Sequence, residues 1–308
     1  MENTCCDFCG ADDADILYIG AGWKHPVPQD CALVRCRRCG LMYLNPRPTP
    51  DEISAFYPDD YPAFRPAVED ERSKLMRWAR HRKLVRRRQV IQKYSGYTTG
   101  RILDVGCSTG LFLHEMEQAG WQVTGIEPTS SAALYARTHF GLEIFQGFLE
   151  QSDYPPQTFD IITFWDVLEH TYSPVRALRY SAELLKPGGI VAINVPNWQS
   201  PDRGWFGPYW SGLDPPRHLF VFTRQTLTAL LNQTGFQPLA WSCFMPSYFP
   251  FIISLECWLS VRIPRLAKPL HRVLNLPGVR YLFEPYFTAM NWLKRGDSIA
   301  VFARKMTS

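Results

Sequence analysis

Short apolar runs alternate with amphipathic segments between residues 101 and 242. The short runs, bounded by glycine, proline or polar residues, predict buried strands, and segments with apolar residues three or four apart predict helices. Such alternation predicts an α/β fold, in which helices cover both faces of a parallel sheet and ligands bind at the carboxyl ends of the strands. The expected strands are Arg101 to Val105, Gln122 to Ile126, Glu143 to Phe145, Phe159 to Phe164, Ile190 to Val195 and Gln237 to Ser242; the expected helices are Thr109 to Ala119, Ser130 to Phe140, Pro174 to Leu185 and Arg224 to Gln233.

A last strand, Ser298 to Ala303, brings the expected sheet to seven strands. Before it lies a long insertion, Phe244 to Gly296, which is rich in aromatic residues. Long connections inside compact domains are usually functional. We interpret this insertion as an element that covers the substrate or faces a membrane.

The turn after the first core strand contains Gly106, Ser108 and Gly110. A dinucleotide-binding turn needs Gly-x-Gly-x-x-Gly, so that the backbone can approach a pyrophosphate, and Ser108 breaks that spacing. Asp104 adds a negative charge, which suits a ligand with ammonium and sulfonium groups such as S-adenosylmethionine (SAM). Glu127 ends the second strand, where a carboxylate can accept both hydroxyls of a ribose.

The segment Leu103 to Gly110 resembles the first motif of the class I SAM-dependent methyltransferases. Three later segments are similar to further motifs of that family, in the same order and spacing: Gly125 to Pro128, Phe159 to His170 and Leu184 to Gly189. The resemblance implies a Rossmann-like, seven-stranded methyltransferase sheet whose final strand is antiparallel. The alternative is a Rossmann-like sheet in which the glycines serve only tight turns.

The same resemblance implies a SAM site at the carboxyl ends of the first four strands. Glycines there let the backbone approach the amino-acid part of the ligand. For Phe148 and Trp165, packing in the core is an equally good explanation. The residues expected to bind SAM are Asp104, Gly106, Cys107, Gly110, Glu127, Pro128, Phe148, Leu149, Trp165 and Asp166.

Two C-x-x-C pairs stand near the start of the chain. A tight turn brings cysteines at this spacing onto the same side, so each pair can place two thiolates on one metal. They predict a small structural zinc ribbon, with strands near Asp15 to Ile19 and Ala32 to Arg35, and the alternative is a set of unligated thiols. This N-terminus resembles the zinc-binding region of a subset of bacterial methyltransferases that includes sugar C-methyltransferases. The expected zinc ligands are Cys6, Cys9, Cys36 and Cys39.

Arg72 to Arg88 contains many lysines and arginines and no acidic residue. The wider segment Arg72 to Tyr94 has a helical pattern with a partial apolar face. The cationic side is explained either as a solvated helix face or as a contact with anionic lipid or a phosphorylated carrier, with nucleic acid as a third explanation. The chain also resembles ubiquinone-pathway O-methyltransferases that dock on membranes.

His218 and His170 are the candidate catalytic bases. A methyltransferase mainly aligns acceptor, methyl carbon and sulfur, and a histidine can remove a proton from the acceptor. The segment Pro215 to Phe220 resembles the histidine-containing segment of the zinc-bearing sugar C-methyltransferases. In those enzymes a tyrosine and a glutamate also surround the acceptor, whereas this chain has Pro215 and Arg217 at the corresponding positions.

These patterns predict a SAM-dependent methyltransferase that acts on a small-molecule, sugar or lipid-linked acceptor. RNA or protein methylation and a non-catalytic SAM-binding or carrier-binding module are the alternatives. The expected parts are the ribbon (1–50), the linker with the basic helix (51–95), the SAM-binding core (96–242), and the insertion with the final strand (243–308).

Composition bears on where the protein works. Nine cysteines without an N-terminal signal peptide fit a reducing cytoplasm, where metal binding is their natural use. The longest apolar stretch, Tyr248 to Val261, contains Pro250 and Glu256 and is too short to span a bilayer. We therefore expect a cytoplasmic protein, at most peripheral at the inner membrane face.

Overall fold

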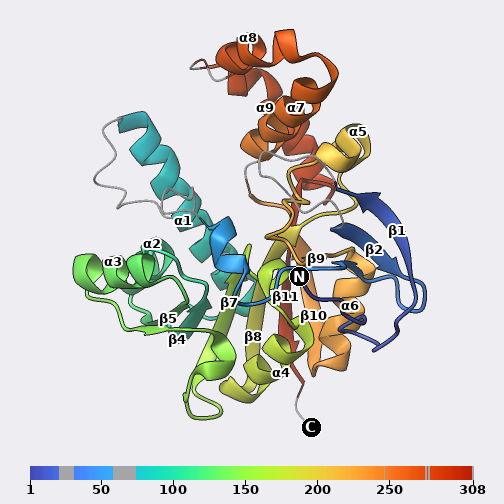
Figure 1. The fold of residues 1–308 in the computed structure, drawn as a ribbon. Coiled ribbons are helices and arrows are strands. Elements are labelled where there is room, and N and C mark those ends of the chain that lie inside the picture. The colour runs from blue at the N-terminus through green and yellow to red at the C-terminus, as the bar shows by residue number, and fades with distance from the viewer. Residues whose placement is uncertain (21–30, 58–73, 246, 275, 277, 307–308) are drawn as a thin grey trace.

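The computed structural model describes residues 1–20, 31–57, 74–245, 247–274, 276 and 278–306 of the 308. Its largest element is a sheet of seven strands: β4 (Arg101–Val105), β5 (Gln122–Glu127), β6 (Ile144–Gln146), β7 (Phe159–Trp165), β8 (Leu185–Pro196), β10 (Phe236–Ser242) and β11 (Ser298–Lys305). They lie in the order β10-β11-β8-β7-β4-β5-β6 (Figure 1). Strands β4 to β8 pair in parallel, and β11 is antiparallel to both of its neighbours. The predicted Rossmann-like sheet is confirmed.

The two faces of this sheet are covered by different helices. Leu103 and Val105 share one core with α4 (Pro174–Leu184) and α6 (Arg224–Gln233). Ile102 shares the other core with α1 (Lys74–Ser95), α2 (Leu111–Gln118) and α3 (Ser130–Phe140). Because side chains alternate across a strand, Asp104 lies on the same face as Ile102 and therefore faces α1 to α3.

Two elements differ from the sequence-based prediction. Strand β8 already begins at Leu185, which pairs with Phe159, and the Nζ of Lys186 lies 2.8 Å from a carboxylate oxygen of Asp160. The residues from 185 to 189, which the sequence predicts as a turn, therefore belong to the first part of strand β8. The predicted basic helix starts at Lys74 in the structure, and positions 72 and 73 lie outside the described residues.

The N-terminal ribbon has three strands of its own, β1 (Ala14–Ile19), β2 (Ala32–Cys36) and β3 (Met42–Leu44), followed by a 3₁₀ turn, η1 (Ile53–Phe56). A fourth, β9 (Phe220–Val221), comes from the core and pairs antiparallel with β3. The ribbon and the loop before β9 therefore form one hydrogen-bonded sheet.

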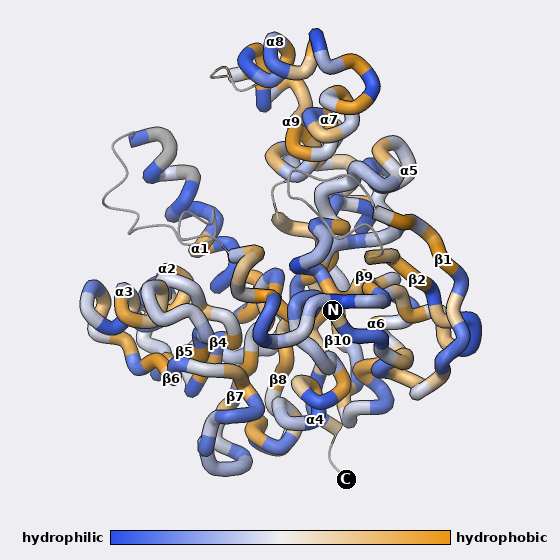
Figure 2. Tube along the Cα trace, viewed as in Figure 1, coloured by the Kyte–Doolittle hydropathy of each residue, from blue (hydrophilic) through white to orange (hydrophobic). Residues whose placement is uncertain are grey.

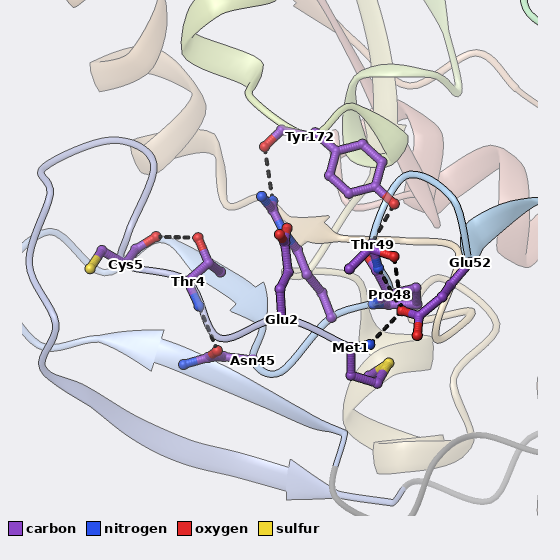
Figure 3. A network of polar contacts seen from close by, with 10 residues as sticks. Met1, Glu2, Thr4, Cys5, Asn45, Pro48, Thr49, Glu52 and Tyr172 are labelled. Atoms are coloured by element: carbon purple, nitrogen blue, oxygen red, sulfur yellow. Dashed lines mark hydrogen bonds and ion pairs between the residues drawn. The ribbon is translucent and has the colours of Figure 1, made fainter.

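Polar contacts also hold the start of the chain against the core. Arg47 donates to Glu2 through Nε and to the carbonyl of Tyr172 through Nη1, both at 2.8 Å, and Tyr172 in turn donates to the carbonyl of Pro48 at 3.0 Å (Figure 3). Asp7 accepts hydrogen bonds from the Ser173 hydroxyl and the backbone N–H of Val175 at the start of α4. The ribbon is thus attached to the core at more than one point.

The remaining helical elements are the short η2 (Leu149–Gln151), η3 (Leu168–His170), α5 (Pro201–Phe206) and η4 (Gly207–Tyr209), and three helices in the insertion, α7 (Tyr248–Arg262), α8 (Pro264–Leu274) and α9 (Val279–Trp292). The insertion helices form a lobe with a small core of its own around Tyr248, Ile252, Leu274 and Phe287. The lobe stands at one end of the main sheet, beside α5 (Figure 1). Within the described part of the chain, no helix has the length and apolar character needed to cross a membrane.

Candidate functional site

Glu127 lies at the carboxyl end of β5 and is fixed by two backbone groups. Its Oε2 accepts the N–H of Ser108 at 2.8 Å, and its Oε1 accepts the N–H of Thr129 at 2.9 Å. Burial raises the pKa of this carboxyl, and the two N–H groups oppose that rise. A carboxylate has about four acceptor positions, so both oxygens can still accept a hydroxyl from a ligand.

The glycine turn is packed tightly against the neighbouring strand ends. Gly106 has a φ of 70°, and a Cβ at this position would lie 2.6 Å from a methyl group of Val167. Its N–H and that of Cys107 both donate to the carbonyl of Ile126. Gly110, with a φ of 78°, precedes α2 and leaves no room for a side chain beside Leu142. The turn therefore brings backbone close to the Glu127 carboxylate.

Asp104 is buried beneath this turn and contacts the hydroxyl of Thr163, which donates to its Oδ1. Burial raises the pKa of Asp104 to about 7, although Thr163 and the nearby Arg87 guanidinium lower it. Asp104 therefore sits at the border between its neutral and charged forms near neutral pH. A cationic ligand group placed nearby would favour the charged form.

Arg87 of α1 is a site residue that the sequence analysis did not identify. Its guanidinium lies over the Trp165 ring at 5.2 Å, and its Nη2 is 3.5 Å from Asp166 Oδ2. The Nε is buried and has no hydrogen-bond partner among the described residues. Burial lowers the pKa of Arg87, and the charges of Asp166 and Asp104 oppose that shift. The signal in the sequence was its position on the same helix face as Leu84 and Ile91.

The residues expected around the nucleoside lie at the ends of β6 and β7. Leu149 and Trp165 are buried, whereas Phe148 keeps 49% of its surface exposed. Packing in the core therefore accounts for Trp165 but not for Phe148. Asp166 has a φ of 61° and accepts a hydrogen bond from the Asn194 side chain, while its other oxygen faces Arg87. Pro128 follows Glu127 directly and is exposed.

The structure brings together the two candidate bases. The rings of His170 and His218 meet edge to face, with centroids 4.6 Å apart. One ring nitrogen from each of these histidines and one carboxylate oxygen of Glu169 lie within 4.8 Å of one another. Glu169 is fully buried, neither of its carboxylate oxygens has a hydrogen-bond partner in the described residues, and burial raises its pKa well above the usual range. These three side chains form a polar cluster, and the charges of Asp214 and Arg217 lie close to it.

The hydrogen bonds of the two histidines fix their proton positions. The Nδ1 of His218 lies 2.9 Å from the carbonyl of Gly212, and the Nδ1 of His170 lies 3.0 Å from the carbonyl of Arg217 and 3.0 Å from the Tyr57 hydroxyl. A carbonyl only accepts, so we assign the proton of each neutral ring to Nδ1, which leaves Nε2 as an acceptor. Burial lowers the pKa of both rings, that of His170 to about 3.

The loop that carries His218 is held by an ion pair. Arg217 donates to both carboxylate oxygens of Asp214, at 2.9 and 2.7 Å, and Asp214 stays charged because the nearby His218 and Arg217 lower its pKa against the effect of burial. Arg217, which stands where the sugar C-methyltransferases have a glutamate, is thus engaged within its own loop.

The four cysteines expected to bind zinc come together. Two sulfur pairs, Cys6 with Cys39 and Cys9 with Cys36, are 3.4 and 3.5 Å apart, and all four sulfurs lie within 4.8 Å of one another. A tetrahedral zinc with Zn–S bonds of about 2.3 Å requires sulfurs roughly 3.8 Å apart. The thiols therefore fit a structural zinc ion.

Comparison with known sequences agrees with this geometry. A sequence model of the family described as "Methyltransferase domain" matches residues 76–240, just over half of the chain. Ubiquinone biosynthesis O-methyltransferases of Yersinia pestis (strain Pestoides F) and Yersinia pseudotuberculosis serotype O:1b are 36% identical over 114 residues. That alignment covers 35% of this chain and 47% of each relative, so the chain matches about half the length of these curated proteins.

Solved structures show the same fold at low identity. A Galdieria sulphuraria protein assigned as a sarcosine dimethylglycine methyltransferase aligns with a TM-score of 0.50 and 13% identity, covering 78% of this chain and 90% of that one. A Bacillus halodurans C-125 protein assigned as a methyltransferase aligns with a TM-score of 0.50 and 18% identity, covering 73% of this chain and all of that one.

Proposed function

The chain belongs to the methyltransferase domain family, and on that premise we propose that it transfers a methyl group from SAM to a small-molecule, sugar or lipid-linked acceptor. The observation that carries this proposal is the placement of Glu127. Its carboxylate ends β5 beside the Gly106 turn, held by the N–H groups of Ser108 and Thr129. A carboxylate fixed in this way can accept ribose hydroxyls, and the tight turn provides no Gly-x-Gly-x-x-Gly cradle for a pyrophosphate.

Charges around the turn support a zwitterionic ligand. Asp104 lies under the turn and can pair with an ammonium group. Arg87 faces the same region with a buried Nε that lacks a partner among the described residues, so it can donate to a carboxylate. We propose that these two residues hold the amino-acid end of SAM, while Glu127, Phe148 and Leu149 hold its nucleoside end.

When bound, SAM supplies an electrophilic methyl carbon on a positively charged sulfur. The acceptor's lone pair forms the new bond to that carbon as the carbon–sulfur bond breaks, and the sulfur keeps the bonding pair and becomes neutral. The acceptor's proton then needs a base. His218 suits this role because its Nδ1–H is fixed on Gly212 and its Nε2 is available, whereas the pKa of about 3 makes His170 too weak a base near neutral pH.

We propose that His170 and Glu169 position His218 rather than accept the proton. The His170 ring abuts His218 edge-on, and its own Nδ1 contacts Arg217, the residue before His218 in the chain. The pKa of Glu169 is raised so far by burial that we expect its carboxyl to be neutral, and a neutral carboxyl can donate to an imidazole nitrogen.

A zinc ion bound by Cys6, Cys9, Cys36 and Cys39 would have a structural role, because four thiolates leave no open coordination position. It would hold the ribbon whose β3 pairs with β9, directly after the His218 loop. We therefore propose that the metal supports the acceptor side of the site without taking part in the chemistry.

Isothermal titration of SAM into the purified chain tests the proposal. We expect wild type to bind, and Glu127→Ala to lose binding. Glu143→Gln, a change of an exposed carboxylate in the same region, is the matched control and should bind as wild type does. Binding of a nicotinamide or flavin in place of SAM, or unchanged SAM affinity in Glu127→Ala, would contradict the proposal.

Two rival functions have their own tests. RNA or protein methylation predicts a gel shift with steep salt dependence or a labelled macromolecule after incubation with methyl-tritiated SAM. A non-catalytic SAM-binding module predicts that SAM binds and no extract component becomes labelled. Label in a small or lipid-linked product supports the leading proposal.

The basic helix has two kinds of cation. Arg87 and Arg88 turn toward the core, and Arg88 donates to Glu115 at 2.9 Å. Exposed cations on the same helix include Arg77, Arg82 and Arg86. We propose that this exposed outer row, rather than the whole run from 72 to 88, contacts an anionic surface or carrier. Flotation with anionic vesicles before and after neutralising Arg77, Arg82 and Arg86 tests it.

A further inference from the structure

The α7–α9 lobe (residues 248–292) carries more exposed large hydrophobic side chains than any other part of the described chain. Of the 20 large hydrophobic residues that are exposed among the described residues, 11 lie between positions 249 and 293. Leu282 keeps 79% of its surface exposed and Trp292 82%. Such a concentration on one element marks an interaction surface.

These side chains form rows along the helices. On α9, Leu282, Pro285, Ala289 and Trp292 are all exposed, and their spacing of three, four and three residues places them on one side of the helix. The opposite side buries Phe287 in the core of the lobe. Helix α9 is therefore apolar on its outer side as well as its inner side.

On α8 an apolar row and a cationic row run side by side. Leu266, Pro269 and Val273 are exposed at a spacing of three and four residues, and Arg265, Lys268 and Arg272, one position earlier in each case, are exposed next to them. Figure 2 shows the resulting mixture of hydrophobic and hydrophilic segments along the lobe. A helix with this arrangement matches the boundary between lipid headgroups and acyl chains.

The charge of the lobe identifies its partner. Between residues 248 and 295 there are seven lysines or arginines and two glutamates, whereas the whole chain has 33 basic and 29 acidic residues. A second copy of the same surface would bring like charges together, but an anionic bilayer offers both opposite charge and an apolar interior. Exposed tryptophan is also typical of residues that settle at a membrane interface.

We propose that the α7–α9 lobe docks on an anionic lipid bilayer as an interfacial element, with Leu282 and Trp292 inserted among the lipids and the α8 cations on the headgroups. The lobe follows β10 and precedes β11, and β10 runs in the same direction as β8, so the lobe is inserted at the carboxyl edge of the sheet. Docking would turn that edge, which also carries Glu127 and the two histidines, toward the membrane. The proposal depends on the lobe alone and stands independently of the reaction.

Vesicle flotation of the full chain tests the proposal. We compare vesicles of pure phosphatidylcholine with vesicles containing about 30% phosphatidylglycerol, at low and high salt. Wild type should float only with the anionic vesicles, and less at high salt. Leu282→Ser with Trp292→Ser, and separately the triple change Arg265→Gln, Lys268→Gln and Arg272→Gln, should each lower the partition coefficient onto the anionic vesicles by roughly one to two orders of magnitude.

The control variants make the same kinds of substitution at exposed positions outside the lobe. Leu134→Ser removes an exposed leucine from α3, and Arg176→Gln with Arg179→Gln removes exposed cations from α4. Both should float like wild type, and all variants should keep the wild-type unfolding temperature and SAM affinity. No flotation of wild type, equal flotation of the lobe variants, or loss only when Arg77, Arg82 and Arg86 of α1 are neutralised would overturn the proposal. So would a wild-type dimer that the Leu282 and Trp292 changes dissociate.

Discussion

The cofactor half and the acceptor half of the candidate site are built in different ways. Asp104 and Glu127 lie on the adjacent strands β4 and β5, and the turn with Gly106 that joins β4 to α2 is specified by a short stretch of sequence. The acceptor half combines η3, the loop before β9, and Tyr57 from the N-terminal part of the chain. The first half can be recognised from local sequence, whereas the second exists only after distant segments have packed together.

The largest expected effect is a loss of kcat without a loss of SAM affinity, which would distinguish the acceptor half from the cofactor half. His218→Asn removes the proposed base and should lower kcat about 10²- to 10⁴-fold while the SAM dissociation constant stays near wild type. Single-turnover methyl transfer and SAM titration measure the two quantities. Equal losses in both would show that His218 supports the whole site rather than the acceptor half.

Removing the metal should affect the same half through structure. Cys36→Ser breaks the tetrahedral set and loosens the ribbon, whose β3 pairs with β9. We expect kcat/KM for the acceptor to fall about a hundredfold, comparable with losing support for a catalytic group, with little change in SAM affinity. Cys5→Ser, at an exposed thiol outside the cluster, is the control. Zinc content should fall only in the first variant.

Arg87→Met tests the cofactor half from the side of α1. Losing a charged hydrogen bond to a ligand carboxylate should weaken SAM binding by roughly ten- to a hundredfold, since such bonds contribute about 1.5–3 kcal/mol. Arg86→Met, a neighbouring exposed cation, should have no effect. A ligand lacking the amino-acid part, such as adenosine, should bind Arg87→Met and wild type equally.

Asp104 should also change how the free energy of unfolding depends on pH. The pKa of Asp104 is raised to about 7 in the fold, so between its unfolded value near 3.8 and 7 the folded state holds a proton that the unfolded state has lost. The contribution of Asp104 to the free energy of unfolding should therefore fall as the pH rises through this window and level off above it. In Asp104→Asn this part of the decline, at most about 1.4 kcal/mol per pH unit, should disappear from urea unfolding curves, whereas other buried carboxyls with raised pKa values, such as Glu169 and Asp297, keep their own contributions.

The sequence predicted the sheet and the Glu127 turn well because their signals are local. Strand β5 and its terminal carboxylate lie within a few residues of the glycine turn, and apolar periodicity identifies the strands. Arg87 was missed because one inward-facing arginine looks the same as its exposed neighbours in a cationic run. Its position on the helix face of Leu84 and Ile91 is a weak signal, and its contact with Trp165 exists only in the fold.

Other features of the structure could not be predicted from a single sequence. Strand β9 is two residues long, too short to show alternation, and its pairing with β3 depends on tertiary packing. Glu169 stands in a recognisable motif, but its burial without a partner among the described residues follows from the approach of His218. The insertion was identified as a special element from its length and aromatic content, and the structure resolves it into three helices.

The pairing of β3 with β9 also has a consequence for the order in which the molecule is made. During synthesis, Met42–Leu44 emerges from the ribosome long before Phe220–Val221, so the outer edge of β3 keeps unpaired backbone groups while strands β4 to β8 of the core are translated. The N-terminal part can reach its final form only late. Chains that stop before residue 220 should be the ones that chaperones and proteases recognise.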